Sequence, residues 1–215
     1  MGFADRQVAD IAASLPGATQ VFRAHKIDFC CGGQVPLAEA AARGGVPLQA
    51  LEDELARLDG GAVEVPQETG ALIDHILTRY HETHRRELPE LIRLAAKVEA
   101  RHAGHPEVPH GLEQLLRQTA QALEEHMVKE ELVLFPLLRG GGHPMVHMPI
   151  GVMRSEHDEH GARLAQLEAL THDCVVPADG CASWQALYAG LRKLIDEVRE
   201  HVHLENNVLF PRFAA

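Results

Sequence analysis

An internal repeat of histidine and glutamate limits how this chain can fold. Residues 125–136 have the pattern Glu-His-x3-Glu-x2-Val-Leu-Phe-Pro, and residues 200–211 repeat it 75 positions later. A second pattern, His-x2-His-x3-Leu-x2-Leu, starts at His81 and again at His157, 76 positions later. Leucine spacing alone recurs by chance in helical proteins, but that does not explain His and Glu at the same steps twice. The repeat therefore predicts a duplicated pair of helices.

Helical periodicity extends through most of the chain. Four long patterns are joined by short connections, and they cover residues 71–103, 110–138, 149–172 and 183–210. Only 4% of the residues are aromatic, which disfavours a β-sandwich or barrel. We therefore expect an all-α protein with a C-terminal up-down-up-down four-helix bundle. Within it, Pro89 should kink or break the first long helix, and Ser183 should cap the last.

The first part of the chain has shorter helical patterns, separated by Gly and Pro. These patterns cover residues 5–15, 18–25, 36–43 and 47–58. Between the second and third lies Asp28-Phe29-Cys30-Cys31-Gly32-Gly33, a turn in which we expect the two glycines to allow positive φ. We predict a small helical domain at residues 1–62, a linker, and the bundle at residues 71–213.

Polar residues interrupt the apolar stripes of the second and fourth long helices. His126 and Glu130 lie on one stripe, and His201 and Glu205 lie on the other. Residues at i and i+4 are neighbours on a helix, so each His-x3-Glu pair points into one layer of the bundle. A buried carboxylate needs a compensating positive charge, and the sequence has no Lys or Arg at these layers. The first stripe is predicted to consist of Leu112, Leu115, Leu116, Leu123, Met127, Val133, Leu134 and Leu137.

A bound metal would compensate these carboxylates. With His81 and His157, the set has four imidazoles and two carboxylates, which fits Fe, Mn or Zn better than a soft metal. Six ligands are too many for one tetrahedral zinc ion. We predict two iron ions, each held by two histidines, with Glu130 and Glu205 as bridges and a solvent-derived oxygen completing the bridge. The ferritin-like spacing, Glu-x-x-His, is absent from this set.

The composition excludes several classes of partner. Acidic residues outnumber basic ones, 31 against 20, which argues against binding to nucleic acid or to an anionic membrane surface. No segment has the apolar length of a membrane helix, and the N-terminus does not have the features of a signal peptide. Four cysteines are too few for a disulfide scaffold in this chain, so we expect a cytoplasmic protein. Cys174 and Cys181 form either a loop disulfide or free thiols.

Three motifs resemble a known family. They are the segments 28–33 (Asp-Phe-Cys-Cys-Gly-Gly), 79–91 (Arg-Tyr-His-x2-His-Arg-x-Glu-Leu-Pro-Glu-Leu), and 155–159 (Ser-Glu-His-Asp-Glu) taken with 204–211. Over nearly its full length the chain resembles the RIC family (repair of iron centres), the YtfE/ScdA/DnrN/NorA-like proteins. These proteins combine a hemerythrin-like di-iron bundle with an ScdA-type N-terminal domain. The resemblance implies six metal ligands, in agreement with the repeat: His81, His126, Glu130, His157, His201 and Glu205.

The resemblance also implies a function. It indicates a protein that repairs iron–sulfur clusters after nitrosative or oxidative damage, by supplying iron or by binding and reducing nitric oxide. Its partners would be damaged iron–sulfur proteins and nitric oxide or oxygen, and it would be a monomer or homodimer. Whether it is an enzyme stays open. The alternatives are an oxygen or nitric oxide carrier or sensor without repair activity, and an iron-oxidising store.

Proton-coupled chemistry at the irons would benefit from a spare acid near them. One turn before His126 the residue is Ala122, which cannot serve. Glu156 is the best candidate, with Glu125 behind it, although Glu156 is equally well explained as a solvated acid on a helix face. His84 and His160 could be ligands, outer partners of the ligands, or exposed residues.

Cys30 and Cys31 are the remaining candidates for chemistry. In one interpretation they are exposed thiolates that handle iron, nitric oxide or electrons, with thiol pKa values lowered by His25 and Lys26. In the other they are small side chains that pack within a turn. We favour the first interpretation, because two adjacent thiols before Gly-Gly are unusual as mere packing residues.

Overall fold

The protein is all-α. The computed structural model describes residues 2–58, 65–142 and 145–213, and within these ranges it has no β-strand. One isolated antiparallel bridge joins Gln7 to Pro36. None of the described helices combines the length and the apolar character needed to span a membrane. The predicted fold class is confirmed, whereas the predicted domain boundary at residue 62 lies outside the described residues.

The chain divides into two compact units. One comprises Met1–Leu72 together with Arg199–Ala215, and the other comprises Ile73–Val198. The first unit contains four short helices, α1 (Val8–Ser14), α2 (Ala18–Ala24), α3 (Leu37–Gly44) and α4 (Leu48–Ala56). Their apolar faces form a small core that includes Val8, Ile11, Phe22, Phe29, Leu37, Leu51 and Leu55. Helix α1 also packs against Leu204–Leu209, so the C-terminal end of the chain completes this unit.

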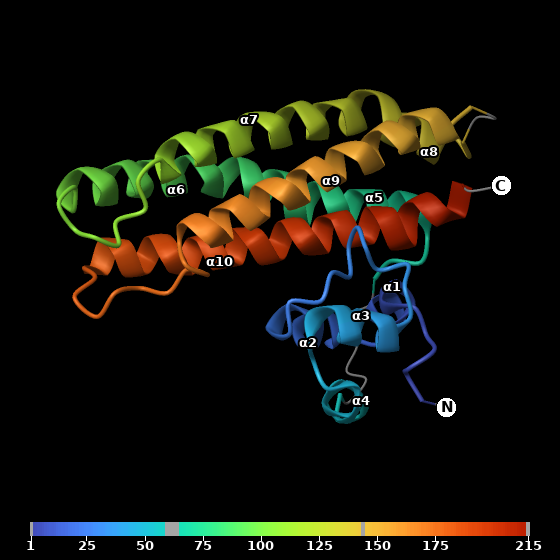
Figure 1. Cartoon of the computed structure of the whole chain (residues 1–215). Coiled ribbons are helices and arrows are strands. Elements are labelled where there is room, and N and C mark those ends of the chain that lie inside the picture. The colour runs from blue at the N-terminus through green and yellow to red at the C-terminus, as the bar shows by residue number, and fades with distance from the viewer. Residues whose placement is uncertain (1, 59–64, 143–144, 214–215) are drawn as a thin grey trace. The chain divides into compact units, whose positions relative to one another are not determined.

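Four long helices form the bundle. They run side by side in Figure 1 and are α6 (Glu82–Arg101), α7 (Leu112–Lys129), α9 (His147–Leu170) and α10 (Ala182–His203). Helix α5 (Thr69–Ile76) precedes α6, and α8 (Phe135–Arg139) follows α7. Helix α7 packs against both α6 and α9. The predicted four-helix bundle is therefore confirmed.

Two of the expected helix signals differ in the structure. Pro89 lies inside α6 and does not break it, so of the two expected effects, a kink or a break, the break is wrong. Its neighbours Leu88 and Leu91 are buried, so packing on this face offsets the backbone hydrogen bond that proline cannot donate. Helix α10 begins at Ala182, and the Cys181 carbonyl accepts hydrogen bonds from the N–H groups of Trp184 and Gln185, the third and fourth residues of the helix. Ser183 therefore lies inside the first turn and is not the N-cap.

Three segments of the long helices are π-helical. They are Leu77–His81, Glu130–Leu134 and Leu204–Leu209. A π-helical turn holds one more residue than an α-helical turn, so side chains beyond it are rotated by about 100° around the helix axis. Such turns occur often at functional sites.

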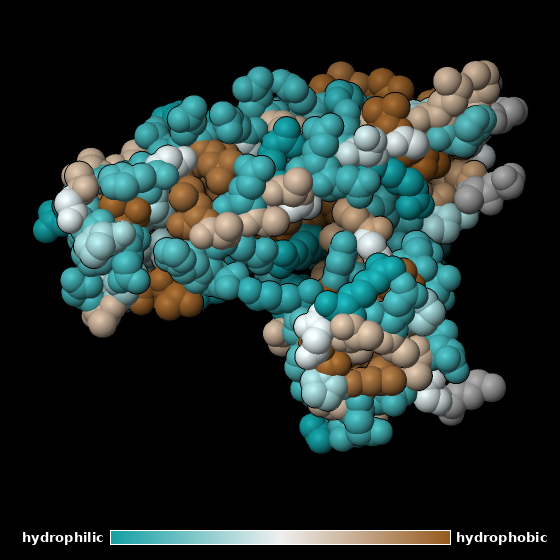
Figure 2. Space-filling model, in the orientation of Figure 1, coloured by the Kyte–Doolittle hydropathy of each residue, from teal (hydrophilic) through white to brown (hydrophobic). Residues whose placement is uncertain are grey.

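The π-helical segment after α7 changes which residues are buried. Val133 and Leu137, expected on the buried stripe, are 53% and 38% exposed. Leu134 is buried as expected, but Phe135 and Leu138 are buried in place of Val133 and Leu137. The buried face therefore moves by one residue along this segment. The predicted stripe is therefore wrong at Val133 and Leu137. Figure 2 shows the resulting brown, apolar surface over the end of the bundle where α8 lies.

Candidate metal centre

The six side chains singled out by the repeat gather in the interior. None of them is more than 2% exposed. One group, with one ligand atom from each residue and all atoms within 4.8 Å of one another, consists of His81, Glu130, His201 and Glu205. A second group with the same spacing consists of His126, Glu130, His157 and Glu205. Because both carboxylates belong to both groups, the arrangement fits two neighbouring cations that share them.

The ring nitrogens in this cluster face one another and the carboxylates. Nε2 of His126 lies 3.1 Å from Nε2 of His157, and at this distance at most one of the two nitrogens carries a proton. Nε2 of His81 and Nε2 of His126 each lie 3.4 Å from an oxygen of Glu130. Imidazole lone pairs and carboxylate oxygens thus converge in a buried space. A cation is the natural occupant of such a donor set.

The π-helical segments carry part of the cluster. Each of the three includes one cluster residue, respectively His81, Glu130 and Glu205. Nε2 of His201, at the end of α10, lies 3.2 Å from Oε1 of Glu205 in the next turn. The wider turns therefore occur where the helices supply ligand atoms.

A carboxylate outside the cluster orients His81. Oε1 of Glu131 lies 2.7 Å from Nδ1 of His81 and also accepts a hydrogen bond from Arg85 at 2.8 Å. Burial raises the pKa of Glu131, but the hydrogen bonds from Arg85 and His81 outweigh this, so its pKa lies below the ordinary value. A carboxylate at Nδ1 keeps the proton there and directs the Nε2 lone pair into the cluster. The sequence analysis did not identify Glu131.

Glu156 has the same relation to His126. Its Oε2 lies 2.9 Å from Nδ1 of His126, and its Oε1 accepts a hydrogen bond from Lys129 at 2.5 Å. Burial raises the pKa of Glu156, but the hydrogen bonds from Lys129 and His126 outweigh it and lower the pKa overall. This geometry makes Glu156 a support for His126, and its role as a proton donor stays a prediction. Glu125, the second candidate for a spare acid, is exposed and accepts a hydrogen bond from Gln121.

His84 and His160 are buried at 0% and 4% exposure, so they are not the exposed residues that one interpretation allowed. The ring centroid of His160 lies 4.9 Å from that of His126. Among the described residues, neither histidine belongs to the two groups of ligand atoms. His160 therefore lies next to the cluster without belonging to either group, and His84 packs against the ring of Tyr80, with 6.3 Å between the ring centroids.

Comparison with known proteins identifies the family. Residues 72–213 match the hemerythrin HHE cation binding domain, and residues 4–59 match ScdA_N, a domain of unknown function (DUF542). A "Probable iron-sulfur cluster repair protein" of Haemophilus influenzae is 43% identical over 218 residues, covering 99% of this chain and 98% of that protein. Proteins named "Iron-sulfur cluster repair protein YtfE" from Citrobacter koseri and Escherichia coli O17:K52:H18 are each 44% identical over 218 residues. Each match covers 100% of this chain and 99% of the relative. The chain belongs to the family of YtfE-like iron–sulfur cluster repair proteins.

In this YtfE-like chain the Cys-Cys-Gly-Gly turn is built around Asp28. Its carboxylate accepts hydrogen bonds from the N–H groups of Cys30, Cys31 and Gly32, at 3.0, 3.1 and 2.9 Å. Neither glycine of the turn has positive φ, so that expectation is wrong. The glycines are needed for space, because a Cβ at Gly33 would lie 2.7 Å from the backbone oxygen of Phe29.

The thiols of this turn are half-buried. A hydrogen bond with Cys31, burial and the negative charge of Asp28 together raise the pKa of Cys30 well above its ordinary value. Nε2 of His25, one of the two residues expected to lower the thiol pKa values, lies 3.0 Å from Glu54 Oε1. The raised pKa makes Cys30 a weaker acid than an ordinary cysteine, opposite to the lowered pKa expected from the sequence. The function of both cysteines stays a prediction.

The other two cysteines of this YtfE-like protein are free thiols. Cys174 is buried, with its sulfur 3.4 Å from Oγ1 of Thr171. The sulfur of Cys181 lies 3.2 Å from Nε2 of His102. Of the two alternatives left open by the sequence, the structure therefore has free thiols.

Proposed function

We propose that this protein is a di-iron protein that repairs iron–sulfur clusters damaged by nitrosative or oxidative stress. One observation carries the proposal: two groups of buried ligand atoms share Glu130 and Glu205 and include no thiolate. This donor set suits iron. The relatives named as iron–sulfur cluster repair proteins, 43–44% identical over the whole chain, supply the process. By the same likeness we propose that the protein acts in the cytoplasm.

The proposed ligands divide between two irons. His81 and His201 would hold one iron, His126 and His157 would hold the other, and the two glutamates would be shared, as in the groups described above. Iron held in this way supplies electron exchange and binding of small ligands such as nitric oxide or oxygen. The protein's part is to keep these ligands deprotonated and away from bulk water, which their exposure of at most 2% provides.

The surrounding residues have supporting roles in this proposal. Glu131 and Glu156 hold the proton on Nδ1 of His81 and His126, so that Nε2 can bind metal. Glu156 is also partly exposed, with 21% of its side chain accessible, which gives a proton a route between solvent and the His126 ring. Cys30 and Cys31 are proposed to assist the transfer of iron or electrons to the damaged protein.

Repair of a damaged enzyme tests the function. A purified iron–sulfur enzyme is inactivated with nitric oxide, and its activity is followed after addition of the iron-loaded protein. We expect activity to return with wild type and with Glu90→Ala, whose carboxylate lies on the surface and pairs with Arg93. We expect no recovery with Glu130→Ala/Glu205→Ala, which removes both shared carboxylates.

The same experiment separates repair from a carrier or sensor. If the wild-type protein binds nitric oxide or oxygen reversibly but restores no activity, the repair proposal is wrong and the carrier or sensor takes its place. If the damaged enzyme regains activity with Glu130→Ala/Glu205→Ala, the metal centre takes no part in the repair and that part of the proposal is wrong. Cys30→Ser/Cys31→Ser tests the thiols separately, because repair should then fail while metal content is unchanged.

A further inference from the structure

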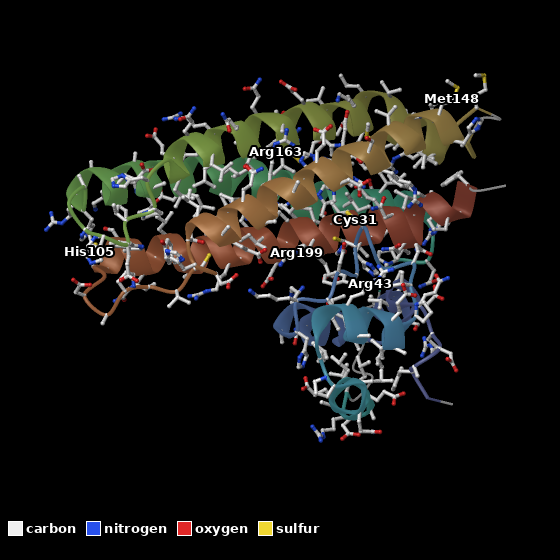
Figure 3. All side chains as sticks on the ribbon, viewed as in Figure 1. Cys31, Arg43, His105, Met148, Arg163 and Arg199 are labelled. Carbon is white, nitrogen blue, oxygen red and sulfur yellow. The ribbon has the colours of Figure 1, made fainter. Side chains whose placement is uncertain are left out.

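The last long helix carries a second set of polar residues beside the cluster residues. Asn206 Nδ2 donates to the backbone oxygen of Cys30 at 3.2 Å. Asn207 Nδ2 lies 3.1 Å from the oxygen of Phe29 and 3.2 Å from that of Cys30. Nδ1 of His203 lies 3.2 Å from the same Phe29 oxygen. We call His203, Asn206 and Asn207 the clasp. Figure 3 labels Cys31 in the turn that these residues hold.

The clasp completes the polar contacts of the cysteine turn. Asp28 binds the N–H groups of this turn, and the clasp binds its carbonyl groups, so both polar sides of the backbone are held. The Phe29 ring also packs edge-on against the His203 ring, with 5.5 Å between their centroids. His203 and Asn206 are buried at 1% and 3% exposure, so these contacts are shielded from water.

The clasp and the cluster residues alternate along the same stretch of helix. His201 and Glu205 are four residues apart and have their nitrogen and oxygen 3.2 Å from each other in the cluster. His203 and Asn207 are also four residues apart, and their side-chain nitrogens lie 3.0 Å from each other beside the cysteine turn. Asn206 directly follows Glu205 in the π-helical segment. A movement of the Glu205 backbone therefore moves the clasp.

The internal repeat shows that the metal cluster by itself does not require a clasp. The residues 75 positions earlier than the clasp are Val128, Glu131 and Leu132. Val128 and Leu132 are 36% and 74% exposed, and Glu131 supports a cluster histidine. The two halves agree at the cluster residues and differ at the clasp positions. The clasp is therefore a specialisation of the fourth helix for holding the cysteine turn.

We propose that His203, Asn206 and Asn207 are positioning residues that fix Cys30 and Cys31 to the helix segment carrying Glu205, so that metal binding at Glu205 orders the two thiols. The hold on the turn follows from the contacts alone. The response to metal rests on the proposed metal centre, because a ligated Glu205 restrains the turn of helix that includes both asparagines.

Alkylation of the cysteines tests the hold on the turn. The full-length, metal-free protein is treated with iodoacetamide, and the rate at each cysteine is measured by mass spectrometry. Asn206→Ala/Asn207→Ala should raise the rate at Cys30 and Cys31 about 25-fold, since losing each asparagine donor raises the open population by roughly fivefold and the two factors multiply. Cys181, which lies outside the turn, is the internal reference.

Two further variants make this result interpretable. Val128→Ala/Leu132→Ala changes the corresponding positions of the first half and should leave the rates at Cys30 and Cys31 unchanged. If circular dichroism shows that the double asparagine variant is unfolded, Asn207→Ala is used alone, with about a fivefold increase expected. Rates within about twofold of wild type in the folded asparagine variant would overturn the clasp.

A second arm tests the response to metal. Anaerobic loading with Fe(II) should slow alkylation of Cys30 and Cys31 in wild type, whereas Asn206→Ala/Asn207→Ala should bind the same amount of iron without slowing. The coupling would be overturned if iron slowed alkylation in that variant as much as in wild type. It would also be overturned if iron-loaded wild type were alkylated as fast as the metal-free protein. If wild type binds no iron but the asparagine variant still alkylates faster, the metal centre is refuted and the clasp is supported.

Discussion

Replacing Glu131 measures how strongly the cluster depends on residues that do not reach it. Its Oε1 lies 2.7 Å from Nδ1 of His81, and its side chain is 27% exposed. Removing such an outer carboxylate typically lowers metal affinity by 10–100-fold, or about 1.4–2.7 kcal/mol. We expect Glu131→Gln near the lower value, because the amide oxygen still accepts the hydrogen bond. Glu131→Ala should be near the upper value, because both the hydrogen bond and the charge are lost.

The structure also predicts which metal position weakens. His81 belongs to the group with His201, whereas His126 belongs to the group with His157. Glu131→Gln should therefore weaken one of two bound ions and leave the other close to wild type. Glu156→Gln should weaken the other ion, because Glu156 supports His126.

A chelator competition checks this prediction. The variants are loaded anaerobically with Fe(II), titrated with a chelator, and analysed for metal per chain, where one early and one late release step are expected. Glu124→Gln is the matched control, because Glu124 also binds Arg85 but contacts no cluster histidine in the described structure. Equal release curves for Glu131→Gln and Glu124→Gln would refute the role assigned to the outer carboxylate.

Three further predictions concern stability and pH. Gly33→Ala should lower the free energy of unfolding by about 1–3 kcal/mol, because its Cβ would meet backbone atoms. Gly104→Ala is the control and should leave the free energy of unfolding unchanged by contact, because its Cβ meets open space; chemical unfolding measures both variants. Metal affinity should fall below pH of about 6.5, since imidazole ligands must be neutral, and unchanged metal content well below that pH would exclude histidine ligation. Burial raises the pKa of Glu87, but hydrogen bonds from Lys193 and Arg86 outweigh it and lower the pKa. This contribution to stability is present above the unfolded-state pKa and is lost as pH falls through the folded-state pKa, so Glu87→Gln should flatten the acid side of a stability–pH curve.

The cluster could be predicted because its residues obey a local rule. Apolar periodicity assigns the helices, and a His-x3-Glu pair on an apolar face must point into the bundle. His126 with Glu130 and His201 with Glu205 follow this rule, and all four are buried. The helices needed no tertiary information beyond the pattern itself.

The π-helical turns could not be predicted in this way. Their stability depends on the balance between a weaker backbone geometry and the contacts it permits, and those contacts come from other helices. Pro136 and Pro211 are the one local signal, six residues after Glu130 and Glu205 respectively. A proline donates no backbone hydrogen bond, so it is compatible with the altered pairing of the turn before it. Missing this signal placed Val133 and Leu137 on the wrong face.

Residues whose role depends on contacts between distant parts of the chain also could not be predicted from helical periodicity. Glu131 acts on His81 from a different helix, and the sequence separation of 50 residues gives no periodicity to detect. At Gly33 the sequence indicated a special backbone position, but the limiting factor is the nearby Phe29 oxygen rather than the sign of φ. In both cases the tertiary fold, and not local preference, decides the role.

The repeat also explains how one duplicated unit can perform two tasks. The cluster needs equivalent His and Glu from each half, which keeps those positions alike. The residue after the shared glutamate is not constrained in this way, and it is Glu131 in the first half and Asn206 in the second. The first binds a cluster histidine, and the second binds the backbone of the cysteine turn. Differences at positions outside the cluster, at Glu131 and Asn206 and at the other two clasp positions, therefore give the two halves separate tasks while the cluster residues stay the same.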